Sequence, residues 1–200
     1  MFAWDWTLRL GLFAVVATFT PGPNALLLLS VAARFGLRPA VPAAVGVAVG
    51  IPSVIVVVGA GLGGAFAALP WLRVALHVLA TVYIGWLGWQ ILRMGSPGDP
   101  AQQAARPVSA WQAAALQWVN PKVWTMAVGA VGAYGVDGGP VVGALSVGAV
   151  FAVVCVPAVG AWTLFGSGIR HWLTSPGRLL VFKVGMGAAL AVSIALTWVA

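Results

Sequence analysis

The sequence predicts an all-α membrane protein of six transmembrane helices, arranged as two inverted three-helix repeats. Three observations support this fold class: a very low content of charge, six long apolar segments, and two helix-breaking motifs at matching places in the two halves. The chain is interpreted as one transmembrane domain over 1–200, with repeat one at about 1–94, a linker at 95–109 and repeat two at about 110–200.

The composition excludes a soluble domain. Of 200 residues, 62% are hydrophobic and only 6% are charged. A soluble domain carries about 25% charged residues, because its folded surface must be wetted by water. Ten basic and three acidic side chains are too few for that purpose, but they suffice for the ends of several membrane helices.

Six apolar segments are long enough to span a bilayer. A hydrocarbon core of about 30 Å needs roughly 20 helical residues. The segments lie at about 7–32, 41–66, 71–93, 110–134, 140–166 and 180–199. They lack the alternation of membrane strands, so helices are expected. The first segment is expected to be retained, because it follows no basic region and Pro21 and Pro23 interrupt it.

Basic residues predict the orientation. The first, third and fifth connections hold most of them: Arg34, Arg38, Arg93, Arg106, Arg170 and Arg178. The positive-inside rule places these connections in the cytoplasm, so that six spans leave both termini outside. The net charge of +7 fits this bias and contact with anionic headgroups of the bilayer. We expect no nucleic-acid partner, because the basic residues form no stripe with interleaved aromatics.

The first helix-breaking motif is Thr20-Pro21-Gly22-Pro23-Asn24, near the middle of segment one. Pro21 and Pro23 each remove a backbone donor and Gly22 is permissive, so a regular helix cannot continue. Unsatisfied backbone groups in hydrocarbon are costly, so this break should face protein or a wet cavity. Asn24 then begins a new half-helix, where its side chain can cap exposed N–H groups.

The second motif, Gln117 to Lys122, lies near the middle of segment four and contains Asn120 and Pro121. Lys122 is about 18 Å along this segment, close to the bilayer centre. A central lysine costs roughly 2.5–3.5 kcal/mol. Taken alone, either motif could be a simple proline kink, and the lysine could snorkel to the interface.

The two motifs together favour a transport site. Pro21 and Pro121 lie 100 residues apart, each in the first helix of a three-helix half. Three is an odd number, so the second half is inverted relative to the first. Inverted repeats with matching broken helices indicate a binding site at the bilayer midplane. Half-helix N-termini can hold a carboxylate and free carbonyls an ammonium, which suits a small zwitterion.

Glycines predict close helix packing. Gly46 and Gly50 form a GxxxG motif on segment two, and Gly85 and Gly88 mark segment three. Small residues of this kind let membrane helices approach closely.

Residues spread over much of the chain resemble the LysE/RhtB family of amino-acid exporters. They are Pro21-Gly22-Pro23-Asn24, Arg34, Gly36, Arg38, Gly46, Gly50, Gly61-Leu62, Tyr83, Gly85, Leu87-Gly88 and Asn120-Pro121-Lys122. The resemblance implies efflux of amino acids or close derivatives across a bacterial cytoplasmic (inner) membrane, driven by the proton gradient. It also implies a multi-pass protein with two inverted three-helix repeats, and often a homodimer.

The resemblance also bears on the substrate. Ala115 to Asn120 looks most like the branch that exports cysteine and O-acetylserine. Ile51 stands where lysine and arginine exporters carry an acidic residue, and no carboxylate lies deep in a segment, so cationic substrates are disfavoured. A small zwitterionic amino acid is the expected partner, and no cofactor or metal is expected.

Candidate site residues follow from both lines of reasoning. Substrate contact is assigned to Asn24, Gln117, Asn120 and Lys122, and shaping of the broken helices to Pro21, Gly22, Pro23 and Pro121. Proton coupling is assigned to Lys122 first, because a buried lysine can titrate near neutral pH, and to His77 second. The single cysteine, Cys155, is interpreted as a small apolar core residue.

Two other function classes stay open. A passive channel, or a transporter for another solute such as a metal ion, would share the membrane architecture. The spans lack the carboxylate, His or Cys clusters that cation sites need. An intramembrane enzyme would need a nucleophile with a base, or a metal cluster, and the sequence shows no such motif.

Overall fold

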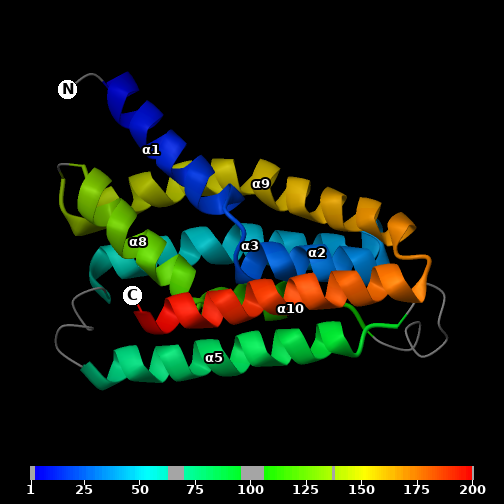
Figure 1. Ribbon diagram of the computed structural model, residues 1–200. Coiled ribbons are helices and arrows are strands. Elements are labelled where there is room, and N and C mark those ends of the chain that lie inside the picture. Colours follow the sequence, from blue (N-terminus) through cyan, green and yellow to red (C-terminus); the bar gives the residue numbers. More distant parts are fainter. Residues whose placement is uncertain (1–2, 63–69, 96–105, 137, 200) are drawn as a thin grey trace.

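The chain folds into a bundle of helices in the computed structural model, which describes residues 3–62, 70–95, 106–136 and 138–199. Within those ranges the chain is helical between short turns and contains no strand, so the all-α class is confirmed (Figure 1). The helices are α1 (Ala3–Phe19), α2 (Pro23–Phe35), α3 (Leu37–Val57) with a π-helical turn η1 (Val58–Leu62), α5 (Pro70–Leu92), α7 (Ala110–Gln117), α8 (Pro121–Tyr134), α9 (Pro140–Trp172) and α10 (Pro176–Val199).

Several of these helices can cross a membrane. Within the described ranges, four continuous stretches are long and apolar enough: Leu37–Gly61, Val74–Leu92, Pro140–Trp172 and Pro176–Ala195. Helices α1 and α2 together make a fifth, bent by 52° at their break. The expected fourth segment divides into α7 and α8, of 8 and 14 residues, and does not meet the same criterion.

Two long helices form the centre of the bundle. Helix α3 packs against α2, α7 and α9, and α9 also packs against α1 and α2. Phe151 and Val147 of α9 and Val54 and Ile55 of α3 are almost completely shielded there. Helices α5 and α10 lie side by side, chiefly against one another (Figure 1). Elements from the two sequence halves are therefore interleaved in one apolar core.

The GxxxG prediction on segment two is confirmed as helix packing. A Cβ atom at Gly46 would collide with the carbonyl oxygen of Ala110, and one at Gly50 with the Cγ of Gln117. Helix α7 can therefore rest directly on the backbone of α3. The same prediction is wrong for Gly85, where no described atom lies within 4 Å of an added Cβ.

Helix boundaries differ from the predicted ones at the end of α9. The fifth segment was expected to end near Gly166, yet α9 continues to Trp172. Gly166 lies against the backbone of Leu29, where an added Cβ would be 2.5 Å from its carbonyl oxygen. This glycine therefore marks a helix contact rather than a helix end. Helix α10 likewise begins at Pro176, before the predicted position 180.

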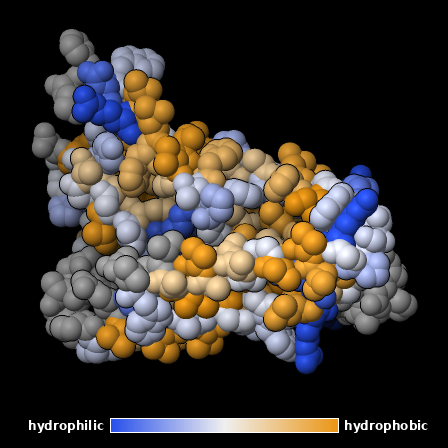
Figure 2. Space-filling view, in the orientation of Figure 1, coloured by the Kyte–Doolittle hydropathy of each residue, from blue (hydrophilic) through white to orange (hydrophobic). Residues whose placement is uncertain are grey.

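The surface has the polarity of a membrane protein. Large apolar side chains are exposed on the outer faces of the long helices; examples are Val16, Val82, Val153 and Val184, each more than 60% exposed. Figure 2 shows hydrophobic residues over most of the visible face and hydrophilic residues concentrated toward its ends. Water would solvate such a face poorly, whereas lipid chains match it, so the chain is a multi-pass membrane protein.

Candidate functional site

The first helix break separates α1 from α2, as the sequence predicts. Thr20 donates from Oγ1 to the carbonyl of Val16 at 2.5 Å, and Pro23 is the first residue of α2. The residue that precedes α2 is Gly22, in extended conformation and with no side chain to cap the helix. The capping role expected for Asn24 is therefore wrong, because Asn24 already lies inside the first turn of α2.

The second break separates α7 from α8 and carries the cap that the first break lacks. Asn120 precedes α8, and its Oδ1 accepts a hydrogen bond from the backbone N–H of Lys122 at 3.1 Å. Pro121, with no N–H to satisfy, takes the first helical position. Trp124 then closes the break by donating from Nε1 to the carbonyl of Trp118 at 2.7 Å.

The two breaks meet through their side chains. Asn120 donates from Nδ2 to Oδ1 of Asn24 at 2.9 Å, and Lys122 donates from Nζ to the carbonyl of Thr20 at 2.5 Å. Thr20 follows the end of α1, where carbonyls lack helical partners and carry partial negative charge, so an ammonium is favourable there. Gly22 leaves room for this lysine, since a Cβ would lie 2.9 Å from its Cδ.

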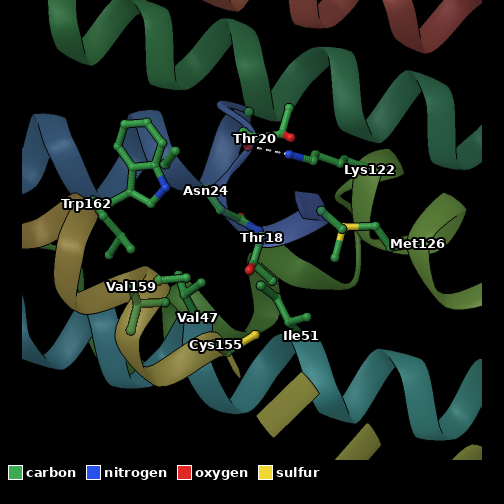
Figure 3. Close-up of a pocket in the computed structure, with 15 residues that line it drawn as sticks. Thr18, Thr20, Asn24, Val47, Ile51, Lys122, Met126, Cys155, Val159 and Trp162 are labelled. Carbon is green, nitrogen blue, oxygen red and sulfur yellow. Dashed lines mark hydrogen bonds between the residues drawn. The ribbon is translucent and has the colours of Figure 1, made fainter. Parts of the chain in front are cut away.

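A pocket lies beside this junction, between α1, α2, α3, α8 and α9 (Figure 3). Thr18, Thr20, Asn24 and Lys122 provide its polar side. The opposite side is apolar and is lined by Val47, Ile51, Cys155, Ala158, Val159 and Trp162. Lys122 is the one charged residue among the described residues that line it. The pocket therefore has a polar side, with one cation and several neutral polar groups, that faces an apolar wall.

Comparison with known proteins identifies the family. The model of the LysE type translocator family matches residues 15–197, which include both breaks and every residue that lines the pocket. The chain belongs to the LysE-type translocator family.

Curated relatives of this LysE-type translocator share one name. The cysteine/O-acetylserine efflux proteins of Escherichia coli strain K12, Shigella sonnei strain Ss046 and Shigella flexneri are each 32% identical to it over 114 residues. The match covers 56% of this chain and 56% of each relative, little more than half of their length. No solved structure matches the chain.

Two predicted site residues of the translocator lie away from the pocket. Gln117 is fully buried, donates from Nε2 to the carbonyl of Ala113 at 2.8 Å and rests on Gly50 of α3. His77 lies between α5 and α10, with its ring 5.5 Å from that of Trp198. The structure therefore brings Asn24, Asn120 and Lys122 together and leaves the other two outside. Their proposed roles stay predictions.

The structure adds pocket residues that sequence reasoning missed. Trp162 of α9 has its indole nitrogen buried with no hydrogen-bond partner among the described residues, on the edge of the ring that faces Asn24 in Figure 3. Cys155, interpreted from sequence as a core residue, is indeed buried but also lines the pocket. Thr18 lines the pocket and donates from Oγ1 to the carbonyl of Ala14 at 2.7 Å.

Proposed function

We propose that this LysE-type translocator is a proton-coupled secondary transporter that exports small neutral amino acids or close derivatives across a bacterial cytoplasmic membrane. The single observation that carries the proposal is the junction of the two helix breaks. Asn24 and Asn120, 96 residues apart in sequence, share a hydrogen bond beside a pocket that also holds Lys122. A simple proline kink in each helix would not require the two breaks to meet.

The topology is part of the proposal. We take α7 and α8 together as one broken span, matching α1 and α2, which gives six spans in two inverted three-helix repeats. The polar groups of Gln112, Gln117, Asn120 and Lys122 lower the hydropathy of this span, and a protein-lined break tolerates them. The basic connections then face the cytoplasm and both termini face outward. A homodimer is proposed on the family resemblance alone.

The pocket has the groups that a zwitterion needs. The backbone N–H groups at the start of α2 have no side-chain cap from Gly22, so a carboxylate can accept from them. Lys122 and the indole N–H of Trp162 add donors on the same pocket. The carbonyl of Thr20 and the Oδ1 of Asn24 are acceptors that an ammonium group can use. One site can thus bind both charges of an amino acid.

The charge of the pocket argues for a neutral side chain on the substrate. No described acidic residue lines the pocket, and Ile51 forms part of its apolar wall. A lysine or arginine substrate would bring a second cation next to Lys122 with no carboxylate to offset it. The relatives are named for cysteine and O-acetylserine, both small and uncharged in the side chain, and we propose a substrate of that class.

The proposed cycle requires the pocket to open to each side of the membrane in turn. Relative motion of the two repeats about a fixed midplane site is the general way in which such folds alternate access.

Uptake into inverted membrane vesicles tests the proposed function. We expect labelled O-acetylserine to accumulate when the vesicle interior is acidified and to stop accumulating when an uncoupler removes the pH gradient. Labelled lysine should not accumulate, and vesicles without the protein are the control. Flux that ignores the gradient would indicate a channel instead, and accumulation of lysine would contradict the assigned substrate class.

A further inference from the structure

A second cleft lies between α2 and α5, away from the pocket already described. Its polar lining comes from Ser30 and Arg34 of α2, Gln90 of α5 and Arg106, which precedes α7. Apolar side chains form the rest of the lining, and Leu27 and Val31 of α2 and Leu87 and Ile91 of α5 are the buried ones on these two helices. The two charged residues that line it in the described part of the chain are both arginines. The cleft is therefore suited to an anion.

Arg34 presents an unused donor to this cleft. Its Nε atom is buried and has no hydrogen-bond partner among the residues that the structure describes. The guanidinium lies 4.9 Å from the ring centre of Phe35. Ser30 already donates to the carbonyl of Leu27 at 2.9 Å, so the donors that face an anion are those of Arg34, Arg106 and Gln90. Guanidinium groups bind phosphate oxygens through paired hydrogen bonds.

The position of the cleft indicates where such an anion comes from. Arg34 lies in the last turn of α2, and Gln90 lies near Leu92, where the apolar span of α5 ends. Both are thus at the depth where hydrocarbon gives way to headgroups. Trp86, which lines the cleft, and Trp89 are exposed on α5, as side chains of an interfacial aromatic belt are. The cleft therefore borders lipid as well as water.

We propose that this cleft binds the phosphate of an anionic phospholipid headgroup. Arg34 and Arg106 hold the phosphate, Gln90 donates to its ester oxygens, and the acyl chains lie along the apolar face of α5. Basic pockets between membrane helices on the cytoplasmic side bind such headgroups in general. The bound lipid links α2 to α5, which otherwise packs chiefly against α10, and so fastens the α5–α10 pair to the rest of the bundle.

Thermal unfolding of the purified full-length protein in neutral detergent tests this proposal. We expect phosphatidylglycerol to raise the midpoint of unfolding, whereas phosphatidylcholine and inorganic phosphate leave it unchanged. Arg34→Gln should weaken the apparent affinity for phosphatidylglycerol by about tenfold or more, because hydrogen bonds to a charged group are lost. Arg38→Gln is the matched control: it removes an exposed arginine that does not line the cleft, and it should keep the full response.

Other results would overturn the proposal. An equal response to phosphatidylcholine would show that the bilayer stabilises the protein without using the cleft, and a response to inorganic phosphate would assign the cleft to a solute. If Arg34→Gln does not fold, Arg106→Gln gives the same test from an exposed position. Lipid binding is measured without transport, so its failure leaves the transport proposal intact.

Discussion

Lys122 shows at the scale of one residue how a cation is kept inside an apolar bundle. An ammonium in such surroundings is tolerated only with a partner, and the carbonyl of Thr20 at the end of α1 provides one. Gly22 leaves the space through which the lysine side chain passes. The alternative of a snorkelling lysine is disfavoured, because Nζ bonds to the opposite helix break instead of reaching toward an interface.

Replacement of Lys122 tests its role directly. Lys122→Ala is expected to abolish transport, because the pocket loses the one charged side chain that the described residues give it. Insertion and yield should stay close to those of the wild type, since removing a half-buried charge relieves part of its desolvation. Lys183→Ala, which removes a lysine on α10 outside the pocket, is the control and should transport normally. Normal transport by Lys122→Ala would mean that the lysine has no part in transport.

Cys155 allows the two proposed roles of Lys122 to be separated. It is the one cysteine of the chain and it lines the pocket, but it is fully buried, so a reagent reaches this thiol only when the pocket opens and the rate of alkylation reports on the site. O-acetylserine should slow its alkylation in the wild type. If Lys122 binds the substrate carboxylate, Lys122→Ala loses this protection; if Lys122 only carries the proton, the protection remains while transport is lost.

Sequence predicts the polar residues of the pocket better than its apolar wall. Asn24, Asn120 and Lys122 could be found because polar side chains inside apolar segments are costly and therefore informative. Trp162 could not be found, because a tryptophan inside a span looks the same whether it packs or faces a ligand. Gln117 was polar and central like the others, but the rotation of α7 turns it toward α3 instead of the pocket.

At the scale of helices, both breaks were predicted, because proline removes a donor wherever it occurs. Sequence could not show which half-helix would be capped by a side chain. The extended residue before α2 is Gly22, whereas before α8 it is Asn120, and this one difference moves the cap to the second break. The end of α9 was misplaced because a glycine at a helix contact, Gly166, has the same local signature as one at a helix end.

The contact between α3 and α7 gives a prediction about stability. Gly46→Ala would press its Cβ against the carbonyl oxygen of Ala110, a backbone atom that cannot move aside by itself. We expect it to destabilise the protein by about 1–3 kcal/mol, as overpacking does. Gly85→Ala is the matched control, because no described atom lies near an added Cβ there and alanine favours a helix.

Thermal unfolding in detergent measures both glycine variants. The midpoint should fall for Gly46→Ala and stay the same or rise slightly for Gly85→Ala. Equal midpoints for the two would show that α7 does not rest on α3 as closely as the structure places it.

At the scale of the whole molecule, composition and segment length predict the helical membrane class, but not which helices touch. Interleaving of the halves depends on close contacts between distant segments, such as Gly166 with the backbone of Leu29, that no local pattern encodes. One long-range feature could be anticipated: basic residues collect at one end. Arg170 donates from Nη1 to the carbonyl of Phe35 at 3.2 Å. The first and fifth connections therefore lie at the same end of the bundle, as the positive-inside rule predicts for two basic connections.

This clustering of basic residues at one end makes the orientation testable. In a Cys155→Ser background, which removes the one native cysteine, Arg38→Cys at the start of α3 and Trp4→Cys in α1 place exposed thiols at opposite ends of the bundle (Figure 1). We expect a membrane-impermeant maleimide added to intact cells to label Trp4→Cys and not Arg38→Cys, because basic connections are retained in the cytoplasm. Inverted vesicles should show the opposite pattern. Labelling of Arg38→Cys from outside would contradict this orientation and place the basic connections on the outer face.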